Sequence, residues 1–399
     1  MILNDFDRDT FLRDYWQQQP LLIKQSGTGF VDPVTADELA GLACEPDMES
    51  RLVTRSDGNN WQLTHGPLNP DRFTRLGETN WTLLVQAVDQ VDPGVNGLKR
   101  YFDFLPAWRI DDIMVSYACD GGGVGPHYDQ YDVFLLQGQG KRVWQIGQRC
   151  DDSTPLRTDT PLSILETFSP QEEFLLEPGD ILYLPPRIAH HGVSRGASLC
   201  YSVGFRAPSV TDLVQDFADV LGGIASDDER FVDPHDSLRG TTTGSSEISG
   251  QAVSSARQLV AGWTERQQLF RDVLGVYATR PRYPERIQPP AVKYRLDDPH
   301  QLFNNDQQAA VFTKNSCSRF FYSPGDDKVF LYVDENVFPC ALQLVPLVQR
   351  LCNTPWHEPL TLSAAEYAAG SVALPLLVQL INQGSLQLAP PADDREPDE

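Results

Sequence analysis

Residues 116–144, SYACDGGGVGPHYDQYDVFLLQGQGKRVW, decide both the fold class and the chemistry that this chain is expected to have. His127 and Asp129 stand two residues apart in a stretch that is predicted to be extended. Side chains at positions i and i+2 of extended chain emerge on the same face. One imidazole and one carboxylate are therefore expected to face the same space.

A third metal ligand is offered by EPGDILYLPPRIAHHG, residues 177–192. Two histidines and one carboxylate form the facial set that suits non-haem Fe(II) and leaves coordination positions open. His190 and His191 are adjacent and would point apart in a strand, so the residues alone leave both open as the third ligand. We expect His190 to be the ligand, with His191 in solvent or behind it.

The glycine-rich run GGGVGP, residues 121–126, precedes the two ligands. Glycine lets the backbone approach a crowded site where a side chain would collide. The run is not a phosphate-binding loop, because GxGxxG is absent and a proline with extended chain follows where a helix would begin.

Arg142 is the candidate for holding an anionic co-substrate. In the strand-like KRVWQIG it shares strand parity with Trp144 and Ile146, and this bulky face is expected to point inward. An unpaired buried arginine is costly, so either an anionic ligand or a protein carboxylate should lie beside it. The guanidinium fork matches a carboxylate such as that of 2-oxoglutarate.

The order of predicted elements indicates an α+β protein. Helices are expected at residues 5–16, 32–45 and 80–91, and a hairpin at residues 51–64. Many short strands separated by Gly and Pro follow between residues 108 and 205, which is typical of a β-barrel or sandwich. Helices return at residues 209–225 and 254–278, and a strand hairpin with short helices resembling a winged helix begins near residue 293.

The amino-acid composition limits the kinds of partner and the cellular location that we expect. A net charge of −23 argues against direct binding to nucleic acid, whose phosphates attract lysine and arginine. It would attract a basic protein partner, but on charge alone the better explanation is that acidity keeps the protein soluble. The seven scattered cysteines lack CxxC spacing and are typical of reduced thiols, so a cytoplasmic location is expected. No run approaches the roughly 20 apolar residues of a membrane span.

These motifs together, with YSVGFRAPS at residues 201–209, resemble the JmjC-type 2-oxoglutarate oxygenases. Within that class the chain is most similar to the bacterial ribosomal oxygenases that hydroxylate an arginine of large-subunit ribosomal protein L sixteen. The resemblance covers nearly the whole chain. It departs from close relatives at Arg187, where they often have glycine, and at His191, where they often have an acid.

The resemblance implies a double-stranded β-helix (a cupin-like jelly roll) that holds Fe(II) through His127, Asp129 and His190, and 2-oxoglutarate through Arg142. Ser116 matches a small polar position near the co-substrate. Asp120 and Tyr128, which flank the metal motif, are candidates for contacting the substrate arginine. The expected reaction is hydroxylation of the arginine β-carbon.

The expected domains are a catalytic domain at residues 1–207, a helical region for homodimerisation at 208–290, a winged-helix-like domain at 291–388 and a disordered acidic tail at 389–399. Two alternatives stay open. The chain could hydroxylate a different residue or protein, or it could be a non-catalytic β-barrel module that only holds a metal.

Overall fold

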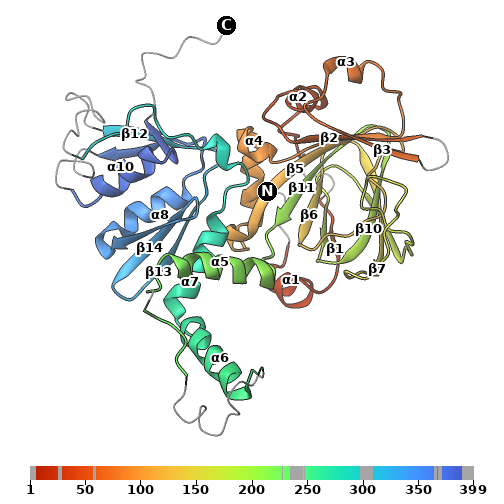
Figure 1. The fold of residues 1–399 in the computed structure, drawn as a ribbon. Coiled ribbons are helices and arrows are strands. Elements are labelled where there is room, and N and C mark those ends of the chain that lie inside the picture. Colours follow the sequence, from red (N-terminus) through yellow and green to blue (C-terminus); the bar gives the residue numbers. More distant parts are fainter. Residues whose placement is uncertain are drawn as a thin grey trace. The chain divides into compact units, whose positions relative to one another are not determined.

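The computed structural model describes residues 6–25, 29–56, 60–226, 228–233, 246, 248–296, 309–363, 366 and 371–388. The chain divides into two compact units, Met1–Ala207 and Pro208–Glu399. Figure 1 shows the strand-rich first unit in red to green and the second unit in green to blue. The boundary between residues 290 and 291 stays a prediction, and the predicted tail at residues 389–399 lies outside the described residues.

The first unit contains two antiparallel sheets. The larger sheet has eight strands, which are in spatial order β1 (Leu21–Ile23), β9 (Ile181–Leu184), β6 (Val133–Gln137), β11 (Ser198–Phe205), β5 (Ile110–Ala118), β4 (Trp81–Val85), β2 (Ser50–Ser56) and β3 (Asn60–His65). The smaller sheet has the order β10 (Ile188–Arg195), β7 (Lys141–Arg149) and β8 (Glu172–Leu176). The expected many-stranded region between residues 108 and 205 is confirmed.

Strand β6 shows why both faces of the larger sheet are covered. All five of its residues are buried. Phe134 and Leu136 belong to a core that includes Phe11 of the N-terminal helix, whereas Val133 and Leu135 belong to a second core. That second core includes side chains of β7 and β8 in the smaller sheet. The two sheets therefore face each other across an apolar interior, as the predicted double-stranded β-helix requires.

Short helices and turns cover the outer face of the larger sheet. Helix α1 (Arg8–Asp14) begins at Asp7, whose Oδ1 accepts hydrogen bonds from two backbone N–H groups of the first turn. Helix α2 (Ala36–Leu42) begins with a capping box formed by Thr35 and Glu38. The remaining helices of this unit are α3 (Pro70–Phe73), α4 (Pro93–Gly97) and 3₁₀ turns at Val88–Gln90, Leu98–Phe102 and Ala107–Arg109.

The helix predicted at residues 80–91 is wrong, because its first half is strand β4. This strand pairs with β2 on one side and β5 on the other, and its last four residues are buried. In a short apolar run that is buried on both faces, the spacing of apolar residues cannot distinguish a strand from a helix. The predicted hairpin at residues 51–64 is confirmed as β2 and β3.

The second unit begins with three helices, α5 (Val210–Gly222), α6 (Gly250–Thr264) and α7 (Gln267–Thr279). The single helix predicted at residues 254–278 is thus interrupted at residues 265 and 266, where Arg266 has extended backbone angles. The interruption allows Trp263 of α6 and Leu269 of α7 to share one buried cluster with α5. No helix in the described part of the chain is long and apolar enough to span a membrane.

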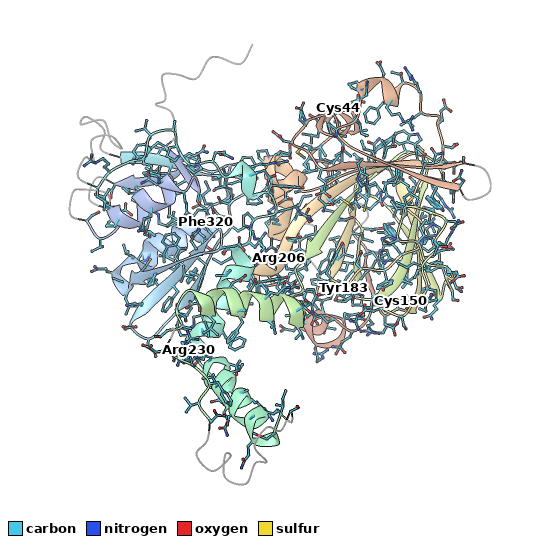
Figure 2. All side chains as sticks on the ribbon, viewed as in Figure 1. Cys44, Cys150, Tyr183, Arg206, Arg230 and Phe320 are labelled. Atoms are coloured by element: carbon cyan, nitrogen blue, oxygen red, sulfur yellow. The ribbon has the colours of Figure 1, made fainter. Side chains whose placement is uncertain are left out.

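Two small sheets and further helices follow in the described part of the second unit. The sheets have the orders β16 (Leu360–Ser363), β12 (Ala309–Lys314), β17 (Leu386–Leu388) and β13 (Phe320–Pro324), β14 (Lys328–Val333), β15 (Asn336–Ala341). Helices α8 (Val345–Asn353) and α10 (Leu374–Asn382) contribute to the core around these sheets, and 3₁₀ turns lie at Pro284–Arg286 and Leu342–Leu344. Figure 2 shows side chains throughout both units, with Tyr183 labelled in the first and Phe320 in the second; both are buried.

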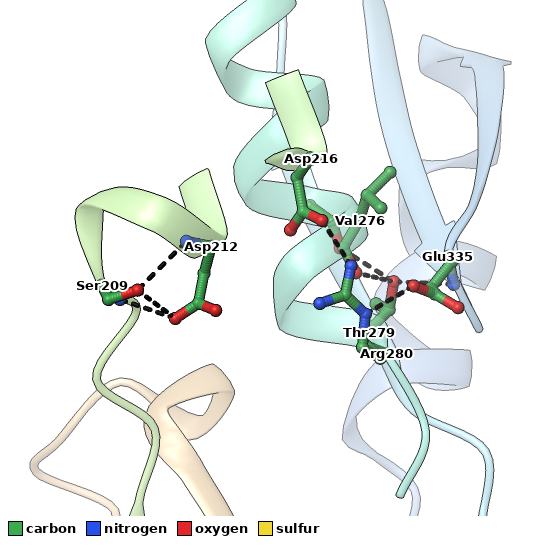
Figure 3. A network of polar contacts seen from close by, with 8 residues as sticks. Ser209, Asp212, Asp216, Val276, Thr279, Arg280 and Glu335 are labelled. Atoms are coloured by element: carbon green, nitrogen blue, oxygen red, sulfur yellow. Dashed lines mark hydrogen bonds and ion pairs between the residues drawn. The ribbon is translucent and has the colours of Figure 1, made fainter. Parts of the chain in front are cut away.

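Arg280 connects three elements of the second unit. Figure 3 shows its guanidinium between Asp216 of α5 and Glu335 of the β14–β15 turn. The Asp216 carboxylate is 4% exposed, whereas Glu335 is 41% exposed. The Arg280–Asp216 contact is therefore the energetically important half of this network, because removing one partner would leave a buried charge uncompensated.

Replacing Arg280 with methionine should destabilise the second unit by about 3 kcal/mol, since the Asp216 carboxylate would stay buried without its cation. Urea titration followed by hydrogen exchange of α5 and α7 peptides measures this change. The control is Glu335→Gln, which weakens only the exposed pair and should cost less than about 1 kcal/mol. Equal losses of stability in the two variants would contradict the larger contribution that we give to the Arg280–Asp216 ion pair.

Candidate metal and co-substrate site

Backbone pairing brings the two candidate histidine ligands together. The N–H of His127 donates to the carbonyl of His190 at 3.0 Å, and the N–H of His190 donates to the carbonyl of His127 at 2.8 Å. This isolated antiparallel bridge places the imidazole centroids 4.3 Å apart. Two segments far apart in sequence therefore present their side chains at one point.

His127, Asp129 and His190 form one cluster in which all candidate ligand atoms lie within 4.8 Å of one another. Asp129 Oδ2 lies 3.6 Å from His190 Nε2. Among the described residues this is the one group of three or more His, Cys, Asp or Glu side chains with such spacing. Two imidazoles and one carboxylate match the donor set of non-haem iron sites.

The tautomers of both histidines fit a metal at this point. His127 Nδ1 lies 2.9 Å from the Gly125 carbonyl, and His190 Nδ1 lies 2.9 Å from the Ile188 carbonyl. A carbonyl only accepts, so each Nδ1 carries the hydrogen and each Nε2 keeps its lone pair for a metal. Burial, reinforced by His127, lowers the pKa of His190 to about 4, which keeps this imidazole in its neutral, ligating form.

His191 stays outside the cluster. Its side chain lies beside the ring of Phe168, with centroids 6.1 Å apart in an edge-on arrangement. Neighbouring residues of a strand point to opposite faces, and His190 and His191 both belong to β10. The structure therefore brings His190, and not His191, to His127 and Asp129.

The glycine run presses the loop before His127 against neighbouring backbone. A Cβ on Gly122 would lie 2.3 Å from the Trp81 carbonyl oxygen, and a Cβ on Gly123 would lie 2.4 Å from the Gly192 carbonyl oxygen. No side chain fits at these distances, so glycine is required for the loop to dock between β4 and β10. The sequence predicted that the glycine loop lies close to other backbone, and the loop indeed contacts the backbone of one strand on each side.

Arg142 lies inside the barrel, as its strand parity predicts. It is 6% exposed, and burial lowers the pKa of its guanidinium. Its hydrogen-bond partners are the hydroxyls of Ser116, at 3.1 Å, and Ser198, at 3.0 Å from Nη2. In the described part of the chain no carboxylate forms an ion pair with Arg142, so the alternative of an internal ion pair finds no support among these residues.

Trp144, two residues after Arg142, adds a second donor to this interior. Its indole Nε1 is buried and has no hydrogen-bond acceptor within the described residues, and its ring centroid lies 5.8 Å from that of His190. A buried guanidinium that no described carboxylate pairs, and an indole N–H without an acceptor among the described residues, suit the binding of an anionic, oxygen-rich molecule.

The two residues predicted to contact substrate have other partners in this structure. Asp120 Oδ1 accepts a hydrogen bond from the Gly196 N–H at 2.7 Å. The Tyr128 hydroxyl donates to the Asp151 carbonyl at 3.0 Å, and its ring packs against a small cluster that includes Cys150. Both contacts are structural, and a substrate role for Asp120 and Tyr128 stays a prediction.

Asp112 and Tyr131 lie near the cluster and were not found from the sequence. The charge of Asp129, then burial, then Asp112 raise the pKa of the Tyr131 hydroxyl, which is hydrogen-bonded to Asp129. Asp112 is 4% exposed and accepts a hydrogen bond from Gln86 Nε2 at 2.6 Å. The signal was available, because Asp112 shares strand parity with Ser116 on β5 and therefore faces the same interior.

The fold and the cluster define a JmjC-type protein, and comparison with known proteins agrees. The JmjC domain family model matches residues 97–213, and the ROXA-like winged helix model matches residues 257–387. The winged-helix-like C-terminal part and the JmjC-type core expected from the sequence are thereby confirmed.

Comparison with individual proteins shows which JmjC-type proteins this chain resembles. The chain is 39% identical to "Ribosomal protein uL16 3-hydroxylase" of Escherichia coli over 294 residues, which is 72% of this chain and 75% of that protein. A solved structure of the E. coli ribosomal oxygenase YcfD has a TM-score of 0.79 at 32% identity and covers 97% of this chain and 99% of that one. Another YcfD structure, with cobalt and 2-oxoglutarate, has a TM-score of 0.77 at 31% identity, covering 97% and 99%. This chain belongs to the ribosomal oxygenase family.

Removing one of the three clustered side chains should abolish tight metal binding. We expect Asp129→Ala to weaken Mn(II) affinity, measured by calorimetry under anaerobic conditions, by more than about 100-fold, because loss even of an outer partner of a ligand costs 10- to 100-fold. The control His191→Ala should bind Mn(II) like the original chain. Loss of binding in His191→Ala with retention in Asp129→Ala would reverse the ligand assignment.

Proposed function

We propose that this chain is an Fe(II)- and 2-oxoglutarate-dependent hydroxylase that acts on the β-carbon of an arginine in ribosomal protein uL16. One observation carries the proposal. A His-Asp-His cluster and a buried arginine that no described carboxylate pairs share one barrel interior, in a chain 39% identical to a uL16 3-hydroxylase. The E. coli protein that was solved with cobalt and 2-oxoglutarate supports the binding of a divalent metal together with 2-oxoglutarate here.

In this proposal His127, Asp129 and His190 hold Fe(II), and the backbone carbonyls of Gly125 and Ile188 fix the two imidazoles with Nε2 toward the metal. Fe(II) and 2-oxoglutarate, when bound, supply the oxidation of a substrate C–H bond by O₂, with release of succinate and CO₂. The protein contributes placement and exclusion of water.

Arg142 holds the distal carboxylate of 2-oxoglutarate. The guanidinium is already desolvated, which costs several kcal/mol for an isolated ion and is offset when a carboxylate arrives with bidentate geometry. Ser116, 3.1 Å from Nη1, supports this end of the co-substrate by holding the guanidinium. A module that only stored metal would have no use for this buried cation, so the structure favours the catalytic function.

Tyr131 offers an aromatic side chain beside the cluster. It is 42% exposed and hydrogen-bonded to Asp129, so it suits a guanidinium that approaches the metal. The net charge of −23 attracts a basic ribosomal protein over longer distances. A cytoplasmic location follows from such a substrate.

Homodimerisation is proposed through α6 and α7. Apolar side chains on these two helices remain exposed, with Val253 at 58%, Val260 at 57%, Phe270 at 40% and Leu274 at 40%. Several exposed apolar side chains on neighbouring helices commonly mark a protein interface.

Hydroxylation of uL16 is tested by mass spectrometry of ribosomal proteins from cells with and without this chain. We expect uL16 to gain the mass of one oxygen on an arginine only when the original chain is present. In cells that carry Asp129→Ala, which lacks the clustered carboxylate, uL16 should keep its unmodified mass. An unmodified uL16 alongside another ribosomal protein that gains oxygen would move the substrate assignment to that protein.

The dimer is tested by light scattering of the purified chain. Val260→Asp with Phe270→Asp should convert a dimer into a monomer, because both charges would be buried in the proposed interface. Val210→Asp, at an 80% exposed site on α5, is the control and should leave the mass unchanged. A monomeric original chain would refute the proposed dimer.

A further inference from the structure

The hydrogen bonds of Arg142 divide its guanidinium into an occupied and an open part. An arginine has five N–H donors. Ser198 Oγ lies 3.3 Å from Nε and 3.0 Å from Nη2, and Ser116 Oγ lies 3.1 Å from Nη1. Three donors are thus used, and one N–H on each terminal nitrogen has no acceptor among the described residues. These two donors are what the guanidinium can still offer to a carboxylate.

Ser198 is itself fixed by a second serine. Ser194 Oγ lies 2.7 Å from Ser198 Oγ and 2.6 Å from the Gly196 carbonyl oxygen. The carbonyl can only accept, so the Ser194 hydrogen is directed to Gly196. The single hydrogen of Ser198 then bridges to Ser194, which leaves both lone pairs of Ser198 toward Arg142.

The fold positions this chain of hydroxyls. Ser194 on β10 is the register partner of Arg142 on β7, and Ser198 is the first residue of β11. The turn between them has Gly196 at φ +74°, and the Gly196 N–H is held by Asp120 Oδ1 at 2.7 Å. Ser194 and Ser198 are 2% and 1% exposed, so water does not compete for these bonds.

We propose that Ser198 is a positioning residue for the co-substrate, which it affects by orienting Arg142. This inference rests on the proposed function, since it assumes that Arg142 holds the distal carboxylate of 2-oxoglutarate. Ser198 occupies the Nε and Nη2 edge, so the guanidinium is held in one orientation with a donor on each terminal nitrogen left for the dicarboxylate. Ser194 keeps Ser198 in the accepting orientation.

The proposal predicts a loss that is specific to the distal carboxylate. We expect Ser198→Ala to weaken 2-oxoglutarate binding on the order of tenfold, because a hydrogen bond to a charged group is lost and the guanidinium is free to rotate. Pyruvate has the same keto acid but no distal carboxylate, so its affinity should not change. Anaerobic calorimetry of the Fe(II)-loaded chain with each keto acid measures both, and the KM for 2-oxoglutarate should rise with little change in kcat.

Two further variants keep the test sharp. Ser194→Ala should weaken 2-oxoglutarate binding by a smaller factor in the same direction, and it serves in place of Ser198→Ala if that variant does not fold. The matched control is Ser50→Ala, which removes a 3% exposed hydroxyl on β2 that bonds to the Ala43 carbonyl after α2, and it should bind both keto acids normally.

The outcomes separate this inference from the proposed function. Unchanged 2-oxoglutarate affinity in a folded Ser198→Ala, or in Ser194→Ala where the first does not fold, overturns the positioning role and leaves the proposed function intact. An equal loss for 2-oxoglutarate and pyruvate also overturns it, since the change would then be a general disruption. No binding of 2-oxoglutarate by the original chain overturns both.

Discussion

The reciprocal backbone hydrogen bonds between His127 and His190 are the constraint on which the site depends. They join the loop before β6 to strand β10, together with the backbone hydrogen bonds of Gly121 and Gly122 with Ser194. The pairing sets the distance between the imidazoles, and the carbonyls of Gly125 and Ile188 set their rotation. The glycines before His127 are required because only a bare backbone fits between the flanking strands.

The same strand β10 places the other end of the site. Its pairing with β7 sets Ser194 opposite Arg142, while His190 lies opposite Ile146 further along. His190 of the metal cluster and the buried cation thus lie on one small sheet, at a separation set by strand geometry. The Arg142 guanidinium contacts two serine hydroxyls and no described carboxylate. Burying a cation in this way is unfavourable in a protein that only stores metal. In an enzyme that binds a dicarboxylate, the same cation is already in place to receive the carboxylate.

The sequence predicted the features that depend on strand parity. His127 and Asp129 share a face because they are two residues apart, and Arg142 points inward with Trp144 for the same reason. The same rule puts Asp112 on the face of Ser116, since the two residues share strand parity on β5, but no motif around Asp112 marks it in the sequence. Ser198 could not have been found in this way, since its contact with Arg142 depends on the register of three strands and a tight turn. The helix predicted at residues 80–91 was wrong because burial on both faces of β4 removes the alternation of polar and apolar residues that identifies a strand. The residues alone could not separate His190 from His191, because that choice depends on the backbone bridge between His190 and His127.

The most direct test is a crystal structure of the chain grown with Mn(II) and 2-oxoglutarate without oxygen. The account predicts an anomalous peak for manganese among His127 Nε2, Asp129 and His190 Nε2. It also predicts the keto acid end of 2-oxoglutarate at the metal and its distal carboxylate bridging the two terminal nitrogens of Arg142. A metal bound elsewhere, or a co-substrate whose distal carboxylate lies away from Arg142, would contradict it.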